Sequence, residues 1–169
     1  MGLYLFNNGP MQTTAAPGKV ATGTSIKTLL QIKPLVQCRI VEWGISFDGN
    51  AAATPGQVEL VETGTVAATV TAFVNNDITK LDGEALLFGD PTSAIFGVGT
   101  GASGYTASAE GSITAVRDLD APQLIAPTSQ FVKQFPLGYR PLLQANNFTR
   151  IRVTFGASIN AYCYAIVEV

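Results

Sequence analysis

A glycine string in the middle of the chain, Gly99-Thr-Gly101-Ala-Ser-Gly104, matches the GxGxxG pattern of dinucleotide-binding loops. An acidic residue follows about 20 positions later, at Asp118 or Asp120, where such loops place the group that binds the ribose. The pattern holds a pyrophosphate only when it leaves a strand and opens a helix whose N-terminus faces the phosphates. Here another glycine interrupts the next segment and a strand-like run follows, so we predict a surface loop that binds no nucleotide.

Two pairs of acidic residues are the other candidates for chemistry, Glu59 with Glu62 and Asp118 with Asp120. Paired carboxylates can hydrolyse glycosides, but no aromatic sugar platform lies near either pair in the sequence. Loops that carry two acids, as at Asp118 and Asp120, also bind hard cations such as Ca²⁺. We favour exposed acids at a strand end over both alternatives. A chelator that leaves the melting temperature unchanged would exclude the ion.

The composition argues against most classes of enzyme. The chain contains no His and 2 Cys, and 13% of its residues are charged while 47% are hydrophobic. Most hydrolases and metalloenzymes use the residue types that are missing, so we expect no catalytic residue, no cofactor and no metal site. The net charge of -2 provides no basic field for a phosphate backbone, so we expect no nucleic-acid partner.

The remaining reactive or charged groups have a structural interpretation. Cys38 and Cys163 both lie in apolar alternating stretches, which predicts two buried free thiols, although a disulfide stays open if their strands are neighbours. Arg150 and Arg152 are the closest approach to a basic cluster. Because they alternate with Ile151 along a strand, we predict that they form its solvent face.

Alternation of apolar and polar residues predicts strands along most of the chain. The clearest strand covers residues 36–47, where Val41, Trp43, Ile45 and Phe47 share one face and the only Trp becomes a core anchor. Further strands are predicted at residues 24–33, 57–63, 69–74, 113–117, 130–135, 149–155 and 161–169.

These elements predict an all-β fold, an antiparallel β-sandwich or jelly-roll-like single domain over residues 24–169. Helical spacing in residues 75–88 favours one short helical or irregular insertion, and the glycines of residues 89–111 favour a loop. Residues 1–23 are predicted to form an extended N-terminal arm.

Two segments carry the residues that we predict to bind a partner. The N-terminal apolar run is too short to fold alone, so we expect the arm to order only against a partner, while a first strand of the sandwich remains the alternative. In the last strand both faces are apolar or aromatic, which predicts a central strand or one covered by a partner. The candidate partner-binding residues are Leu3, Tyr4, Leu5, Phe6, Tyr162 and Tyr164.

Several runs of the sequence resemble structural proteins of tailed phages of actinobacteria. The segments are Ile40-Val-Glu-Trp-Gly-Ile-Ser-Phe-Asp-Gly49, Val58-Glu-Leu-Val-Glu-Thr63, Ala121-Pro-Gln-Leu-Ile-Ala-Pro127 and Phe135-Pro-Leu-Gly138. The similarity covers roughly residues 26–169 and points to the head decoration, or cement, proteins of these phages. Its motifs are structural, so the resemblance carries no catalytic residues over to this chain.

The resemblance implies a non-enzymatic virion protein that is made in the host cytoplasm and located on the capsid exterior. Proteins of this kind are small and mostly β, and they bind the assembled major capsid protein as homo-oligomers, often trimers. No stretch reaches the roughly 18–20 apolar residues of a membrane span, so we expect no membrane partner.

Two other functions remain open from the sequence. The first is a phage tail, fibre or vertex component with receptor- or glycan-binding loops, which the copy number in the virion would distinguish. The second is a cellular β-sandwich binding module such as a carbohydrate-binding domain. That class places aromatic residues along an exposed face, and Tyr162 and Tyr164 are the only candidate pair.

Overall fold

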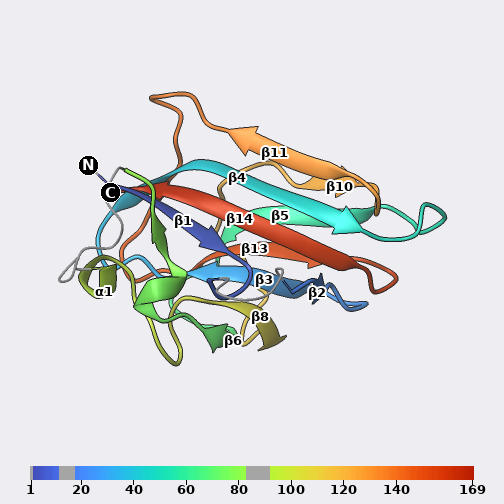
Figure 1. Cartoon of the computed structure of the whole chain (residues 1–169), viewed down its shortest axis with the longest axis horizontal. Helices are drawn as coiled ribbons and strands as arrows, with labels where there is room; N and C mark the ends of the chain where they lie inside the picture. Colours follow the sequence, from blue (N-terminus) through green and yellow to red (C-terminus); the bar gives the residue numbers. More distant parts are fainter. Residues whose placement is uncertain (1, 12–17, 83–91) are drawn as a thin grey trace.

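The chain folds into two antiparallel β-sheets packed face to face, as the alternating pattern predicts, and the computed structural model describes residues 2–11, 18–82 and 92–169 (Figure 1). Sheet A has the order β11-β4-β14-β1-β7, with β12 also on β4 and β2 on β14. Its strands are β1 (Leu3–Asn7), β2 (Val20–Ala21), β4 (Cys38–Asp48), β7 (Thr79–Lys80), β11 (Gln130–Gln134), β12 (Leu142–Leu143) and β14 (Asn160–Glu168).

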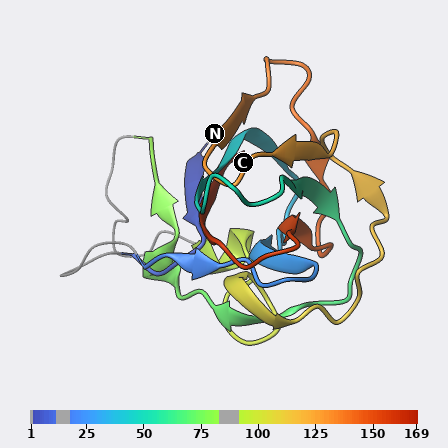
Figure 2. The same cartoon turned by 90° about the vertical axis from the view of Figure 1, so that its right-hand side faces the viewer.

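Sheet B has the order β10-β5-β13-β3-β8-β6, with β9 also on β5. Its strands are β3 (Lys27–Ile32), β5 (Gly56–Glu62), β6 (Thr69–Ala72), β8 (Gly104–Ala109), β9 (Arg117–Asp118), β10 (Gln123–Ile125) and β13 (Thr149–Thr154). Two short helices complete the described elements, η1 (Asn75–Asp77) and α1 (Thr92–Ile95). The end-on view shows the strands arranged around a common interior (Figure 2).

The core forms because large and small side chains alternate across neighbouring strands. Ala165 of β14 lies between Trp43 of β4 and Phe6 of β1, and all three are fully buried. Small residues on the central strand thus leave room for aromatic rings on both sides, which interdigitated packing requires. Trp43 is the core anchor that the sequence predicts, and β14 is the central strand.

A long excursion between β5 and β10, of which residues 63–82 and 92–122 are described, closes one side of the sandwich. Its strand β7 extends sheet A beyond β1, and its strands β8 and β6 extend sheet B beyond β3. Phe96 of this excursion packs edge-on against Phe6, with ring centroids 4.8 Å apart, and Phe73 lies 6.1 Å from the same ring. The excursion therefore supplies part of the core as well as covering two strand edges.

The prediction of an N-terminal arm is wrong for the first strand. Leu3–Asn7 pairs with β14 on one side and with β7 on the other, and Tyr4 and Phe6 point into the core. Alternation of two buried aromatics with outward-facing neighbours is the ordinary pattern of a half-buried strand. Val20–Ala21 also pairs with β14, while residues 12–17 of the predicted arm lie outside the described residues.

Three local predictions also need correction. The loop predicted at residues 89–111 contains strand β8, although residues 89–91 lie outside the described residues. The strand predicted at residues 113–117 is limited to β9 at its end. The helical interpretation of residues 75–88 holds only for the single turn η1, which is followed by β7, and residues 83–88 are not described.

Candidate functional site

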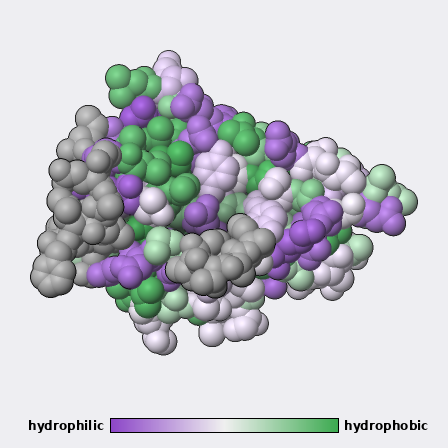
Figure 3. All heavy atoms as spheres, in the orientation of Figure 1, coloured by the Kyte–Doolittle hydropathy of each residue, from purple (hydrophilic) through white to green (hydrophobic). Residues whose placement is uncertain are grey.

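The outward-facing side chains of sheet A form an open face that combines apolar and aromatic residues. On β14, Tyr162, Tyr164 and Ile166 alternate with core residues and are half-buried. The strand register places Leu5 beside Ile166, and it places Val132 on the far side of β4, level with Tyr164. Figure 3 shows apolar side chains gathered on this side of the molecule. Apolar groups gathered at a sheet surface indicate a contact surface.

The side chain of Tyr164 is fixed across the neighbouring strand. Gly44 of β4 lies opposite Tyr164, and a Cβ atom there would come within 2.6 Å of Cε1 of the ring. The glycine makes room for the ring, whose hydroxyl donates a 2.5 Å hydrogen bond to Oε1 of Glu42. Burial, followed by the Glu42 carboxylate, raises the pKa of Tyr164 to about 12. Tyr164 is therefore an uncharged, positioned aromatic ring at neutral pH.

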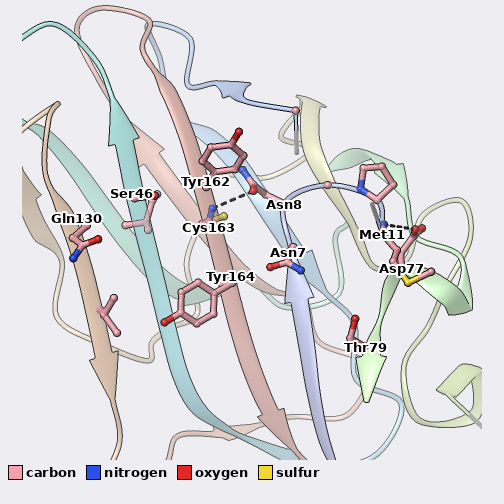
Figure 4. Close-up of a pocket in the computed structure, with 15 residues that line it drawn as sticks. Asn7, Asn8, Met11, Ser46, Asp77, Thr79, Gln130, Tyr162, Cys163 and Tyr164 are labelled. Atoms are coloured by element: carbon pink, nitrogen blue, oxygen red, sulfur yellow. Dashed lines mark hydrogen bonds between the residues drawn. The ribbon is translucent and has the colours of Figure 1, made fainter. Parts of the chain in front are cut away.

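A pocket of about 600 Å³ lies on the open face between β11 and the segment that follows β1 (Figure 4). Every strand of the principal order of sheet A contributes to it, which is possible because their outward positions are in register. The aromatic and polar side chains that these strands contribute are Asn7, Ser46, Thr79, Gln130, Tyr162 and Tyr164. Asp77 is the one charged residue among the described residues that line the pocket.

Hydrogen bonds fix the wall that closes this pocket on the β1 side. The buried amide of Asn8 donates to the Ala161 carbonyl at 3.2 Å and accepts from the Cys163 N–H at 3.1 Å. The N–H of Met11 donates to Oδ1 of Asp77 at 3.0 Å. Figure 4 shows the contacts of Asn8 with Cys163 and of Met11 with Asp77. The pocket is therefore shaped by the fold itself.

The structure separates the predicted partner-binding residues into two groups. Tyr4 and Phe6 are core residues, so their assignment to a partner surface is wrong. Leu3 and Leu5 are half-buried at the alternate, outward positions of the same strand. Tyr162 and Tyr164 line the pocket.

The other polar residues of the pocket were missed by the sequence analysis. Ser46 and Gln130 occupy paired positions, and Ser46 also pairs with Tyr162, so one cross-strand row carries all three. A single polar residue at an outward position of a strand gives no sign of a binding site. Only the strand order, which the sequence does not reveal, brings them together.

The prediction that Asp118 and Asp120 are both exposed acids is correct for Asp118 and wrong for Asp120. Asp120 is buried, where its carboxylate accepts from Nε1 of Trp43 at 3.1 Å and pairs with Nζ of Lys133 at 2.8 Å. Asp118 is exposed at the edge strand β9. Within the described residues, no group of three or more His, Cys, Asp or Glu side chains gathers to hold a metal ion.

The second acidic pair, Glu59 and Glu62, points to opposite sides of β5. Glu59 pairs with Nη2 of Arg152 at 2.6 Å on the outer side. Glu62 is buried, pairs with Nη2 of Arg117 at 3.1 Å and accepts from the N–H of Gln144 at 3.0 Å. Both carboxylates therefore hold structural contacts.

Backbone conformation and close packing explain why the string at residues 99–104 contains glycines. Gly99 and Gly101 have φ of 86° and 72°, a left-handed conformation that favours glycine. Gly104 lies against the backbone of β6, where a Cβ atom would come within 2.3 Å of the Thr71 carbonyl oxygen. The string leads into strand β8, so it lacks the helix N-terminus that a pyrophosphate requires.

The prediction that Arg150 and Arg152 face solvent is wrong. Both are buried beneath the excursion, and Arg150 is 0% exposed. Arg150 donates to the carbonyls of Glu110 and Ser112, both at 3.0 Å, and to the carbonyl of Val66. Burial lowers the pKa of Arg150 to about 10 while Glu110 opposes the shift, so the guanidinium stays charged at neutral pH.

Cys38 and Cys163 are free and buried, as the first interpretation predicts. Burial raises the pKa of both thiols above the ordinary value, to about 12 for Cys38. A thiol with a raised pKa is a poor nucleophile at neutral pH.

A second surface, which we call the open corner, lies where the two sheets end on the same side (Figure 1). Strands β10 and β11 are the last strands in the principal orders of sheets B and A. On these strands and on the turn that follows β11, large apolar side chains are exposed to solvent: Leu124 is 79%, Val132 54%, Leu137 82% and Tyr139 81% exposed, and Val132 also lines the pocket of the open face.

The tip of the open corner is a fixed turn. The N–H of Tyr139 donates to the Pro136 carbonyl at 2.9 Å, and Gly138 has a φ of 93°. Arg140 next to the turn pairs with Glu168 at 2.6 Å. A proline followed by glycine predicts a turn, but the residue types alone do not reveal that Leu137 and Tyr139 are exposed.

Comparisons with known proteins give no relative for this chain. No family model, no curated protein and no solved structure matches it. Among the described residues, no helix has the length and apolar character needed to cross a membrane.

Proposed function

We propose that this chain is a non-enzymatic structural protein of a phage virion. In this proposal it decorates and stabilises the capsid exterior by binding the assembled major capsid protein. The observation that carries the proposal is the open corner, where Leu137 and Tyr139 stand almost fully in solvent on a hydrogen-bonded turn. The resemblance of the sequence to phage head decoration proteins supplies the class of partner.

The open corner can bind a partner at a low cost in conformational entropy. Large apolar side chains lose contact with water when a partner covers them, and this favours binding. A turn that is already fixed does not lose further backbone freedom on binding, so more of that free energy appears as affinity. Within the described residues no strand pairs with the outer edges of β10 and β11, which therefore add backbone groups for a neighbouring chain.

The strand order supports a jelly-roll interpretation of the sandwich. When the excursion is set aside, sheet A has the order β1-β14-β4-β11 and sheet B has the order β3-β13-β5-β10. This is the arrangement of an eight-stranded jelly roll, an architecture that occurs in viral capsid proteins and also in lectins. Because one fold serves many functions, the jelly roll supports the proposal by analogy only.

The proposal includes a homo-oligomer, with a trimer favoured by the resemblance, and a location on the capsid exterior. A tail, fibre or vertex position is the alternative, and it differs in copy number. The two positions would use the same open corner against different partners.

Co-sedimentation with assembled shells tests the proposal. Purified protein is mixed with shells of the encoding phage that lack it, and the bound fraction is measured for the wild type and for the double variant Leu137→Ser, Tyr139→Ser. The control is Val116→Ser, which changes another exposed apolar residue, 61% exposed, outside the open corner. The proposal predicts saturable binding that the double variant weakens at least tenfold and the control leaves unchanged. No binding of the folded wild type to shells would overturn it.

A further inference from the structure

We propose that the pocket on the open face of sheet A binds an uncharged saccharide. This inference goes beyond the proposed function, because attachment through the open corner needs no sugar. It is based on three properties of the pocket: its aromatic rings, its neutral hydrogen-bonding groups and the engagement of its single charge.

The aromatic part of the site is the pair Tyr162 and Tyr164 on β14. One side of the Tyr164 ring lies over Gly44, and its hydroxyl is bound to Glu42, so the ring is held in place across the sheet. Figure 4 shows Tyr162 and Tyr164 projecting from β14 at the same side of the sheet. A pyranose ring presents C–H groups on one face, and these pack on a positioned aromatic ring at little entropic cost.

The polar part of the site consists of neutral amides and hydroxyls. Gln130 and Ser46 lie on the β11 side of the tyrosines, and Asn7 and Thr79 lie on the β1 side (Figure 4). Amide and hydroxyl groups both donate and accept hydrogen bonds, which matches the hydroxyl groups of a sugar. In the described part of the chain, none of these four side chains makes a hydrogen bond to another protein group.

Asp77, the one charged residue among the described residues of the pocket, already accepts hydrogen bonds. The two carboxylate oxygens of Asp77 accept backbone hydrogen bonds, from Met11 at 3.0 Å and from Val74 at 2.9 Å. The described residues that line the pocket include no positive group, so an anionic ligand would lose hydration on entry without gaining a partner.

The alternatives fit this lining less well. A purely apolar ligand would leave the amides and hydroxyls without partners, and each unpaired group costs free energy. The volume of about 600 Å³ lies within the usual range of small-molecule sites, which suits a short oligosaccharide.

Binding to an array of immobilised oligosaccharides tests the inference. The full-length protein is applied to uncharged members together with sialylated and sulfated ones, and the best uncharged sugar is then titrated calorimetrically. We expect uncharged sugars to be preferred, Tyr162→Ala and Gln130→Ala each to weaken the titrated affinity at least tenfold, and Tyr139→Ala to leave it within twofold. Tyr139→Ala is the matched control because Tyr139 lies in the open corner, outside the pocket.

The same variants separate this inference from the proposed function. Tyr139→Ala is expected to weaken shell binding and to keep sugar binding, while Tyr162→Ala is expected to do the reverse. The saccharide site is overturned if the folded protein binds no uncharged sugar at millimolar concentration, if charged sugars are preferred, or if Tyr139→Ala lowers sugar affinity as much as Tyr162→Ala does.

Discussion

The outer faces of the two sheets differ in the polarity of their side chains and in their exposure to solvent. Sheet B carries charged and polar residues outward, among them Arg150 and Gln31, and the excursion buries them completely. Sheet A carries Tyr164 and Ile166 outward, and the described residues leave both half-exposed. The more polar face is covered and the more apolar face is open, which is the reverse of what side-chain polarity alone predicts.

The covered face is polar because it holds loops. A loop that lies on a sheet brings backbone carbonyls and N–H groups that need partners once water is excluded. Arg150 provides donors for such carbonyls, and Gln31 donates to the Ala102 carbonyl at 2.7 Å while accepting from the N–H of Ala68 at 2.9 Å. Glu110 adds two contacts to Thr28, at 2.7 and 2.6 Å. Burial of the polar face therefore serves loop anchoring, while the exposed apolar face is the one on which we propose the ligand pocket.

Arg150→Ala is expected to have the largest effect, because it breaks the covered face. The variant removes the charged partner of the Glu110 carboxylate, 3.6 Å away, and the buried donor of the loop carbonyls, which costs about 3–5 kcal/mol of unfolding free energy. Chemical denaturation measures the loss. The control is Arg39→Ala, an exposed arginine that donates one bond to the Arg140 carbonyl and is expected to cost about 1 kcal/mol or less. Equal losses in both variants would contradict the role of the covered face.

Gly44→Ala tests the close approach on the open face. The added methyl group would come within 2.6 Å of the Tyr164 ring, so the ring must move, at a cost of about 1–3 kcal/mol. Gly156→Ala is the matched control, because no atom lies within 4 Å of an added Cβ and its φ is not positive. Denaturation curves that show the same stability for both variants would mean that Tyr164 does not depend on Gly44.

Tyr164→Phe tests how much one hydrogen bond on the open face contributes to stability. Loss of the bond to Glu42 is expected to lower the unfolding free energy by about 1 kcal/mol at neutral pH. Folding raises the pKa of Tyr164 from 10.0 to about 12, so the unfolded chain releases this proton first. The stabilisation from this group is therefore complete below pH 10 and is lost as the pH rises towards 12.

Ultraviolet titration of tyrosinate tests this assignment. Burial also raises the pKa of Tyr105, so the component that ionises near pH 12 should lose the amplitude of one tyrosine in Tyr164→Phe and keep it in Tyr139→Phe. An unchanged amplitude near pH 12 in Tyr164→Phe would assign the shifted pKa to another tyrosine.

A chelator is expected to have no effect. The Asp120 carboxylate is occupied by Trp43 and Lys133, and Asp118 faces solvent, so the two acids do not form one cation site. The melting temperature should be the same with and without EDTA. A fall in melting temperature that added Ca²⁺ reverses would show that this interpretation of the acidic pair is wrong.

The sequence predicts the fold class because the alternation of apolar and polar residues along a long strand shows which of its side chains are buried. Strands such as Asn160–Glu168 alternate over their full length, and their buried positions are those that the alternation marks. The strand Leu3–Asn7 follows the same rule, but it is short and precedes a Thr/Ala/Gly/Pro-rich stretch, so its place in the sheet depends on partners far along the chain.

The candidate site could be predicted only in part. Tyr162 and Tyr164 are identified because they share the outward face of one strand. Gln130 and Ser46 join them through strand pairing that no local pattern reveals. The sequence does not reveal the burial of Arg150 or the exposure of Leu137 for the same reason: residue type sets a preference for water, but distant segments decide which positions are covered.

Quantitative mass spectrometry of purified virions tests the central claim most directly, by counting this chain against the major capsid protein of the phage that encodes it. The proposed function predicts a ratio on the order of one copy per few shell subunits. A handful of copies per particle, or none, would contradict a role in decorating the capsid.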